Sequence, residues 1–205
     1  MRVEISSLIN RKACSYVNVT TEMLKASGNI AVTFFTQLFN KIFSEGVYPE
    51  QWSRSVIVPL FKRGDKDIPN NYRGISLQSV ASKCYTTVLR NSLTRWMDDH
   101  ENIVETQAGF RKGYFTIDHI YTLSATTEKH LSRTGGQLYV AFVDLRKAFD
   151  SVDRASLFLT FVKVGLSGPF LNAIKEVVSC VRVHNKVTHL KKKIIVPLVS
   201  NRGVF

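Results

Sequence analysis

The sequence predicts an α+β domain, because segments of helical periodicity alternate along the chain with short apolar runs of strand length. Two such runs, Val56–Phe61 and Leu138–Val143, have the length and composition of strands. A hydrophobic fraction of 44% and a charged fraction of 21% over 205 residues are typical of one globular domain or of part of a larger one.

The predicted helices have apolar residues at three-to-four spacing. The first spans 22–45, carries a stripe of phenylalanines, and is followed by Gly46, a residue typical of helix ends. Asp153 suits the N-cap of a helix over 153–164, and Pro169 suits the first turn of a later one. The full set of further helices is 80–96, 116–131, 153–164 and 169–180.

The predicted strands differ in their surroundings. Val56–Phe61 contains Pro59, which donates no ladder hydrogen bond, so an edge or bulged strand is expected. A loop rich in charged and turn-forming residues follows it. Leu138–Val143 is apolar without a break, which predicts a strand buried on both faces. Residues 182–199 alternate around a basic turn and predict a hairpin.

The net charge of +12 indicates a polyanionic partner, and nucleic acid is favoured over an anionic membrane surface. The three cysteines lie far apart without a CxxC pair, which argues against a disulfide framework and a zinc site and favours a reducing compartment. No apolar stretch approaches the roughly 20 residues of a membrane span, and the amino terminus lacks a signal-peptide core. We therefore expect an intracellular protein without a membrane partner.

Asp144 is the best candidate for a metal ligand. Its carboxylate follows directly on the predicted buried strand, where it is costly unless solvated, hydrogen-bonded or bound to a cation. Open sheets bind ligands beyond the carboxyl ends of their strands. The alternative is an exposed aspartate that begins a turn, and position alone leaves both interpretations open.

Two further segments are candidates for phosphate binding. The loop after Val56–Phe61 carries Lys62, Arg63, Lys66 and Arg73, which suit the grip of a triphosphate or, equally, a solvated basic turn. The segment QAGFRKG at 107–113 combines glycines that permit close backbone approach with a stacking aromatic and two cations. Taken alone, each is a weak signal.

In this order, five segments resemble the reverse transcriptase domain of non-LTR (LINE-type) retrotransposons, and the resemblance covers nearly the whole chain. They are PEQW at 49–52, PLFKRG at 59–64, NYRGISL at 71–77, QAGFRKGYFTIDHI at 107–120 and AFVDLRKAFD at 141–150. The resemblance implies a right-hand polymerase fold, with fingers plus a partial palm. It places an N-terminal helical leader at 1–48, fingers at 49–135 and the partial palm at 136–205.

The resemblance also implies roles for single residues. Asp144 matches the first catalytic carboxylate, a ligand of two Mg²⁺ ions, and Phe149 matches the bulky residue that rejects a ribose 2′-hydroxyl. Lys62 and Arg73 match residues that hold the incoming dNTP. The residues that match the template-binding segment are Gly109, Phe110, Arg111 and Lys112. The implied partners are an RNA template, a DNA primer and dNTP, and the implied compartments are nucleus and cytoplasm.

Departures from the family pattern limit the expected activity. Gly74 stands where the family has a proline, which we expect to loosen a turn. The sequence reaches Phe205 without the family's motif of two adjacent aspartates, and after Asp153 its only acid is Glu176. Two-metal transfer needs carboxylates from more than one element. We therefore expect an RNA-directed DNA polymerase domain that binds Mg²⁺ weakly at most and is inactive as this polypeptide.

Two alternatives remain. The first is a non-catalytic RNA/DNA-binding remnant that keeps the basic surface. The second is an unrelated phosphotransferase with an aspartate at a strand end. The latter requires a second acid at position 146, or a nearby Ser/Thr-Lys pair, and the sequence has neither in the expected place.

Overall fold

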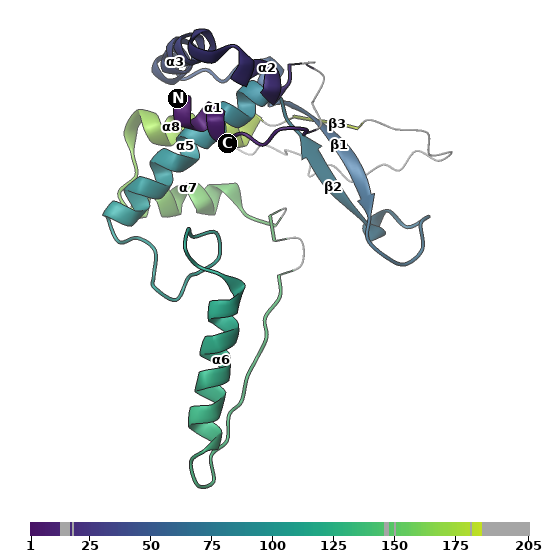
Figure 1. The fold of residues 1–205 in the computed structure, drawn as a ribbon, viewed down its shortest axis with the longest axis vertical. Helices are drawn as coiled ribbons and strands as arrows, with labels where there is room; N and C mark the ends of the chain where they lie inside the picture. The colour runs from purple at the N-terminus through teal and green to yellow at the C-terminus, as the bar shows by residue number, and fades with distance from the viewer. Residues whose placement is uncertain (13–16, 18, 146–147, 150, 181, 186–205) are drawn as a thin grey trace. The chain divides into compact units, whose positions relative to one another are not determined.

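The computed structural model describes residues 1–12, 17, 19–145, 148–149, 151–180 and 182–185. The chain divides into two compact units (Figure 1). The first comprises Met1–Thr94 with Asp153–Phe205, and the second comprises Arg95–Val152. Helices and a small sheet occur together, which agrees with the predicted α+β class.

The helices follow the predicted pattern with one exception. The segment 22–45 forms two helices, because the chain turns at Gly28, whose φ is +53°. The predictions over 80–96, 116–131, 153–164 and 169–180 are confirmed. The helices are α1 (Arg2–Ser7), α2 (Thr21–Ala26), α3 (Gly28–Glu45), α4 (Glu50–Ser53), α5 (Val80–Asp99), α6 (Thr116–Leu131), α7 (Arg154–Lys163) and α8 (Gly168–Cys180), with a 3₁₀ turn, η1 (Pro69–Asn71).

Two predicted helix ends are confirmed in their atomic contacts. Gly46 is left-handed, with a φ of 66°, and its N–H donates to the Ile42 carbonyl at 3.0 Å. Asp153 caps α7, because its carboxylate accepts a 2.9 Å hydrogen bond from the Ser156 N–H. Hydrogen bonds from Ser156 lower the pKa of the Asp153 carboxyl.

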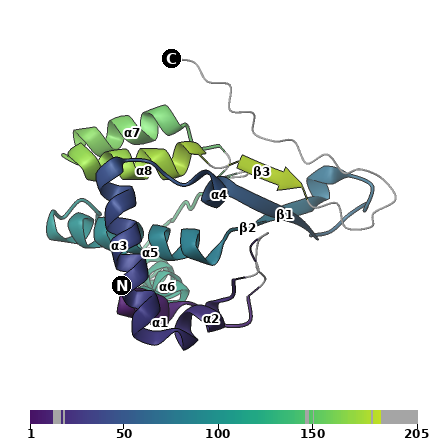
Figure 2. The same ribbon diagram turned by 90° about the horizontal axis from the view of Figure 1, so that it is seen from above.

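The sheet contains β1 (Arg54–Phe61), β2 (Tyr72–Leu77) and β3 (Arg182–Asn185), in the order β2-β1-β3 (Figure 2). β1 and β2 form an antiparallel hairpin, whereas β3 pairs with β1 in parallel along Arg54–Ile57. Although β1 is central, its described pairing with β3 ends before Pro59, which pairs with Gly74 in β2. Gly74 thus lies inside a strand, where we expected a turn.

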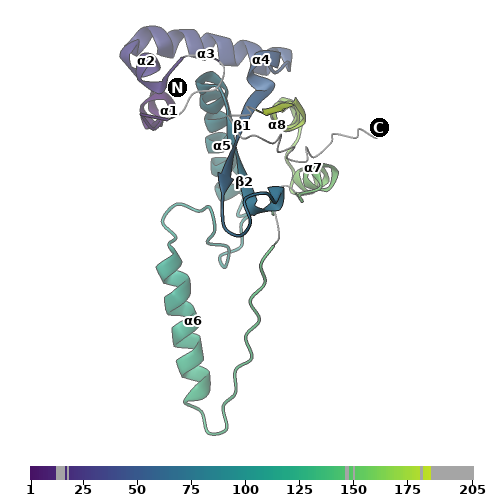
Figure 3. The same cartoon turned by 90° about the vertical axis from the view of Figure 1, so that its right-hand side faces the viewer.

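The predicted buried strand over 138–143 is wrong in this structure. The segment has no regular secondary structure and forms no ladder with any described residue, and Tyr139 and Phe142 are 90% and 84% exposed. An apolar run favours an extended, buried backbone but does not itself provide a partner strand. Figure 3 shows α6 and the following segment running in opposite directions. Most of the hairpin predicted over 182–199 lies outside the described residues.

The hydrophobic core belongs to the first unit. Phe39 of α3 is 4% exposed, and its ring centroid lies 5.1 Å from that of Tyr85 and 5.8 Å from that of Trp52. Tyr48 joins this group, which we call the aromatic cluster, and its hydroxyl hydrogen-bonds to the Ser82 hydroxyl at 2.7 Å. Among the described residues of the second unit, none is buried.

Phe39→Ala tests how much the aromatic cluster contributes to the stability of the fold. We expect it to lower the free energy of unfolding by about 3–5 kcal/mol, the usual cost of deleting a buried phenylalanine. Phe34→Ala on the same helix removes a ring that is 57% exposed and should cost less than about 1 kcal/mol. Urea unfolding followed by circular dichroism measures both variants. Equal losses would contradict the proposed core.

Asp153→Ala tests the cap of α7. Because the pKa of Asp153 is lowered in the folded chain, its cap stabilises the fold above the pKa of the unfolded state and loses this effect as pH falls through the folded value. We expect the variant to have a lower urea midpoint than the parent at pH 7, and we expect this difference to shrink at pH 2. A difference as large at pH 2 as at pH 7 would show that the charge is not responsible.

Candidate functional site

The hairpin of β1 and β2 is anchored at its root and exposed at its tip. Trp52 of α4 lies in the aromatic cluster, and α4 leads directly into β1. Ser55 and Val56 at the start of β1 are buried, whereas the residues from Lys62 to Asn70 are exposed. A packed root therefore presents a basic tip to solvent.

Local hydrogen bonds shape the loop at the tip. Asn71 is central, because its side-chain amide donates to the Asp65 carbonyl at 2.8 Å and its carbonyl accepts from the Lys62 N–H at 2.9 Å. Gly64 has a φ of +94°, and a Cβ there would meet the Asn71 amide nitrogen at 2.8 Å. Tyr72 donates its hydroxyl to the Lys66 carbonyl at 2.9 Å. The loop thus has a defined conformation that only glycine fits at position 64.

Lys62 and Arg73 lie near the tip of the hairpin. Arg73 pairs with Leu60, the ladder ends at the pair of Phe61 with Tyr72, and the Lys62 N–H then donates to the Asn71 carbonyl at 2.9 Å. Both side chains are exposed and form no hydrogen bond or ion pair with any described residue. Both cations are therefore available to an anion.

The second unit contains a loop over 104–114 that is closed around Arg111. The Arg111 guanidinium lies over the Tyr114 ring, 4.4 Å from its centroid, and donates to the Gln107 carbonyl at 3.3 Å. The Tyr114 hydroxyl donates to Glu105 at 2.6 Å, and this hydrogen bond raises the pKa of the phenol. Glu105 and Tyr114 were not among the predicted site residues.

Phe110 and Phe149, predicted separately, lie together in the second unit. Their ring centroids are 6.1 Å apart with an interplanar angle of 76°, an edge-to-face contact. Both rings are mostly in solvent, at 96% and 83% exposure. Because these residues lie far apart in the sequence, sequence analysis does not reveal their contact. The contact joins a predicted template-binding residue to the residue predicted to discriminate between sugars.

Asp144 is exposed and forms no hydrogen bond or ion pair with any described residue. No group of three or more Asp, Glu, His or Cys side chains able to hold a metal occurs in the described part of the chain. Asp150 lies outside that part, and Asp153 is engaged as a helix cap. The described residues therefore do not fit a site for two Mg²⁺ ions, and the role of Asp144 stays a prediction.

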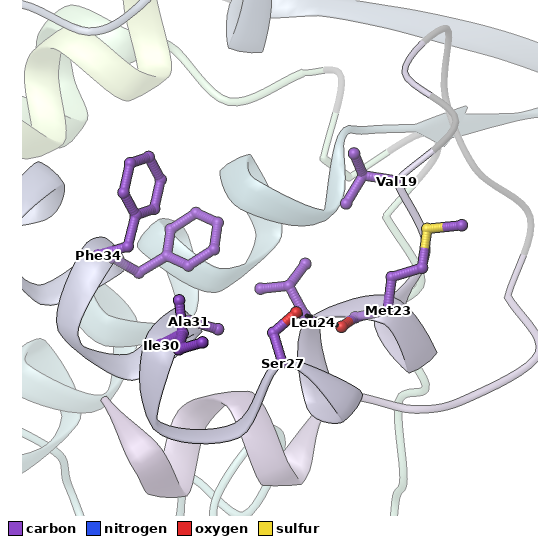
Figure 4. Close-up of a pocket in the computed structure, with 8 residues that line it drawn as sticks. Val19, Met23, Leu24, Ser27, Ile30, Ala31 and Phe34 are labelled. Carbon is purple, nitrogen blue, oxygen red and sulfur yellow. Dashed lines mark hydrogen bonds between the residues drawn. The ribbon is translucent and has the colours of Figure 1, made fainter.

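An apolar groove of about 240 Å³ lies between α2 and α3 (Figure 4). It is lined by Met23, Ile30 and Phe34, among others, and by none of the predicted site residues. The phenylalanine stripe of α3 is thus divided, with Phe39 in the core and Phe34 on the groove. No helix in the described chain is both long and apolar enough to cross a membrane.

Comparison with known proteins adds independent findings. The family model described as reverse transcriptase (RNA-dependent DNA polymerase) matches residues 61–198, more than half of the chain. The "Probable RNA-directed DNA polymerase from transposon BS" of Drosophila melanogaster is 28% identical over 207 residues, covering 98% of this chain and 22% of that protein. The corresponding protein from transposon X-element is 28% identical over 186 residues, covering 87% and 20%.

A third relative is the "Retrovirus-related Pol polyprotein from type-1 retrotransposable element R2" of Nasonia vitripennis. It is 31% identical over 122 residues, covering 58% of this chain and 11% of that protein. The chain spans about a fifth of the length of the two Drosophila relatives. With the family model and these relatives in agreement, the chain belongs to the reverse transcriptase family, as a domain of the non-LTR retrotransposon type.

Proposed function

We propose that this chain forms the fingers and the first part of the palm of an RNA-directed DNA polymerase, and that it binds an RNA template, a DNA primer and dNTP. In this proposal 1–48 is a helical leader, 49–135 the fingers and 136–205 the partial palm. The observation that carries it is the pair of exposed cations near the tip of an anchored hairpin, Lys62 and Arg73, neither of which forms a hydrogen bond or ion pair with any described residue.

The hairpin suits a triphosphate for physical reasons. Phosphoryl transfer depends on positioning and on neutralising negative charge more than on covalent chemistry. Arginine offers a planar fork of donors to phosphate oxygens, and lysine a compact charge. Because the aromatic cluster fixes the root of β1, the Lys62 and Arg73 backbones are held in a set register before a nucleotide arrives.

The second unit carries the proposed template and sugar contacts. Gly109–Lys112 lies against the template in this proposal, and Phe149 excludes a ribose 2′-hydroxyl by its bulk. The family resemblance assigns Asp144 to the metal-binding carboxylates. Since the described residues include no group of three or more side chains able to hold a metal, we propose that the 205-residue polypeptide binds nucleic acid without extending a primer. A non-catalytic nucleic-acid-binding role is the second candidate, favoured by the net charge of +12.

The double variant Lys62→Ala/Arg73→Ala tests the nucleotide site. Charge-assisted hydrogen bonds to two phosphate-binding residues are lost, so we expect dTTP affinity to fall by at least about tenfold. Radiolabelled dTTP in equilibrium dialysis, with a primed RNA template present, measures this affinity. The matched control is Arg63→Ala/Lys66→Ala, which removes the same charge from the same hairpin and its connecting loop. Equal losses of dTTP affinity in the two double variants would show that overall positive charge, and not a site formed by Lys62 and Arg73, accounts for nucleotide binding.

A primer-extension assay with Mg²⁺, dNTP and an RNA template annealed to a labelled DNA primer tests catalysis. We expect no incorporation by the 205-residue polypeptide, while fluorescence anisotropy shows that the same protein binds the primed template. Incorporation that disappears in Asp144→Ala would contradict the proposed inactivity. Absence of binding would instead contradict the proposed partners.

A further inference from the structure

The guanidinium of Arg111 is already engaged inside the 104–114 loop. It lies 4.4 Å from the Tyr114 ring centroid, 3.3 Å from the Gln107 carbonyl oxygen and 3.8 Å from a Glu105 carboxylate oxygen. Its side chain is 22% exposed. A phosphate would have to compete with these contacts, so Arg111 is poorly placed as a phosphate ligand.

The partners of Arg111 are themselves joined across the loop. The Tyr114 hydroxyl donates to Glu105 at 2.6 Å, and Glu105 also faces the guanidinium. The Gln107 N–H donates to the Val104 carbonyl at 3.0 Å. Contacts of Arg111 with residues before and after it therefore close the loop at both ends. We call Glu105, Arg111 and Tyr114 the loop clasp.

The loop clasp encloses a strained residue. Phe110 has a φ of 65°, in the left-handed region that a bulky side chain rarely adopts. Such a conformation persists only where the surrounding structure imposes it, and it is concentrated at functional positions. The Phe110 ring is also 96% exposed, although burial would be favourable for an apolar side chain.

Unlike the Arg111 guanidinium, the side chains on either side of it are open to contact with a ligand. Lys112 is exposed and forms no hydrogen bond or ion pair with any described residue. Phe110 makes an edge-to-face contact with Phe149 but is 96% exposed, so most of its ring stays open to a planar partner. An open aromatic face beside a free cation is the arrangement that binds a nucleobase and its phosphate in single strands.

We propose that Arg111 is a positioning residue that clasps the 104–114 loop, and that this clasp presents Phe110 for stacking on a base of the unpaired template and Lys112 for contact with a phosphate. The inference rests on the proposed function and divides the roles within its template-binding segment. Phe110 and Lys112 contact nucleic acid, and Arg111 acts through them.

The test uses the 205-residue chain and a fluorescein-labelled RNA template annealed to a shorter DNA primer, so that template bases are unpaired. Fluorescence anisotropy gives the dissociation constant over a series of salt concentrations. Phe110→Leu should weaken binding about tenfold, because base stacking is lost, with no change in salt dependence. Lys112→Gln should reduce the slope of log affinity against log salt by about 0.7, the value for one phosphate contact in a single strand.

Arg111→Lys separates positioning from direct contact, because it keeps the charge but not the planar stack on Tyr114. We expect it to weaken binding nearly as much as Phe110→Leu, and we expect the double variant Phe110→Leu/Arg111→Lys to bind about as well as Arg111→Lys alone. Hydrogen exchange of the free protein should be faster over 107–114 in Arg111→Lys and unchanged in α5. Circular dichroism confirms that the variants are folded.

Three other outcomes would overturn the inference. Parental affinity in Arg111→Lys would identify Arg111 as a simple charge contact. Additive losses in the double variant would make Arg111 and Phe110 independent contacts. Parental affinity in Phe110→Leu would remove the stacking role. Each leaves the proposed template binding intact, whereas failure of the parental chain to bind the primed template would instead overturn the proposed function.

Discussion

The packing of Phe39, Tyr48, Trp52 and Tyr85 is the contact on which the basic hairpin depends. These rings join α3, α4 and α5, and α4 continues directly into β1. A hairpin with one polar, exposed end is marginal by itself, so its orientation must come from the packed end. The apolar core of the first unit thus holds Lys62 and Arg73 in place without touching either side chain.

The second unit is organised differently, because none of its described residues is buried. Its order comes from local polar contacts. The Phe115 N–H donates to the Asp118 carboxylate at 2.8 Å at the start of α6, and the loop clasp closes the turn before it. The apolar residues at 139–143 remain exposed there. Polar contacts therefore order the second unit, whereas side-chain burial orders the first.

Periodicity predicted the helices well, because capping and amphipathic spacing are local properties. Gly46 and Asp153 end and begin helices as their types suggest. The strand over 138–143 was not predicted correctly, because pairing depends on a partner that an apolar run does not reveal. Motif order identified the family, but spacing could not show that Arg111 faces Glu105 and Tyr114, nor that Phe110 meets Phe149.

The nucleic-acid contacts proposed for this reverse transcriptase domain include two structured loops, 62–71 in the first unit and 104–114 in the second, each taken by itself. Hydrogen exchange of the 205-residue chain, measured with and without a primed RNA template and dTTP, tests this proposal most directly. We expect slower exchange in both loops and unchanged exchange along α3. Protection confined to other parts of the chain, with both loops exchanging as in the free protein, would contradict it.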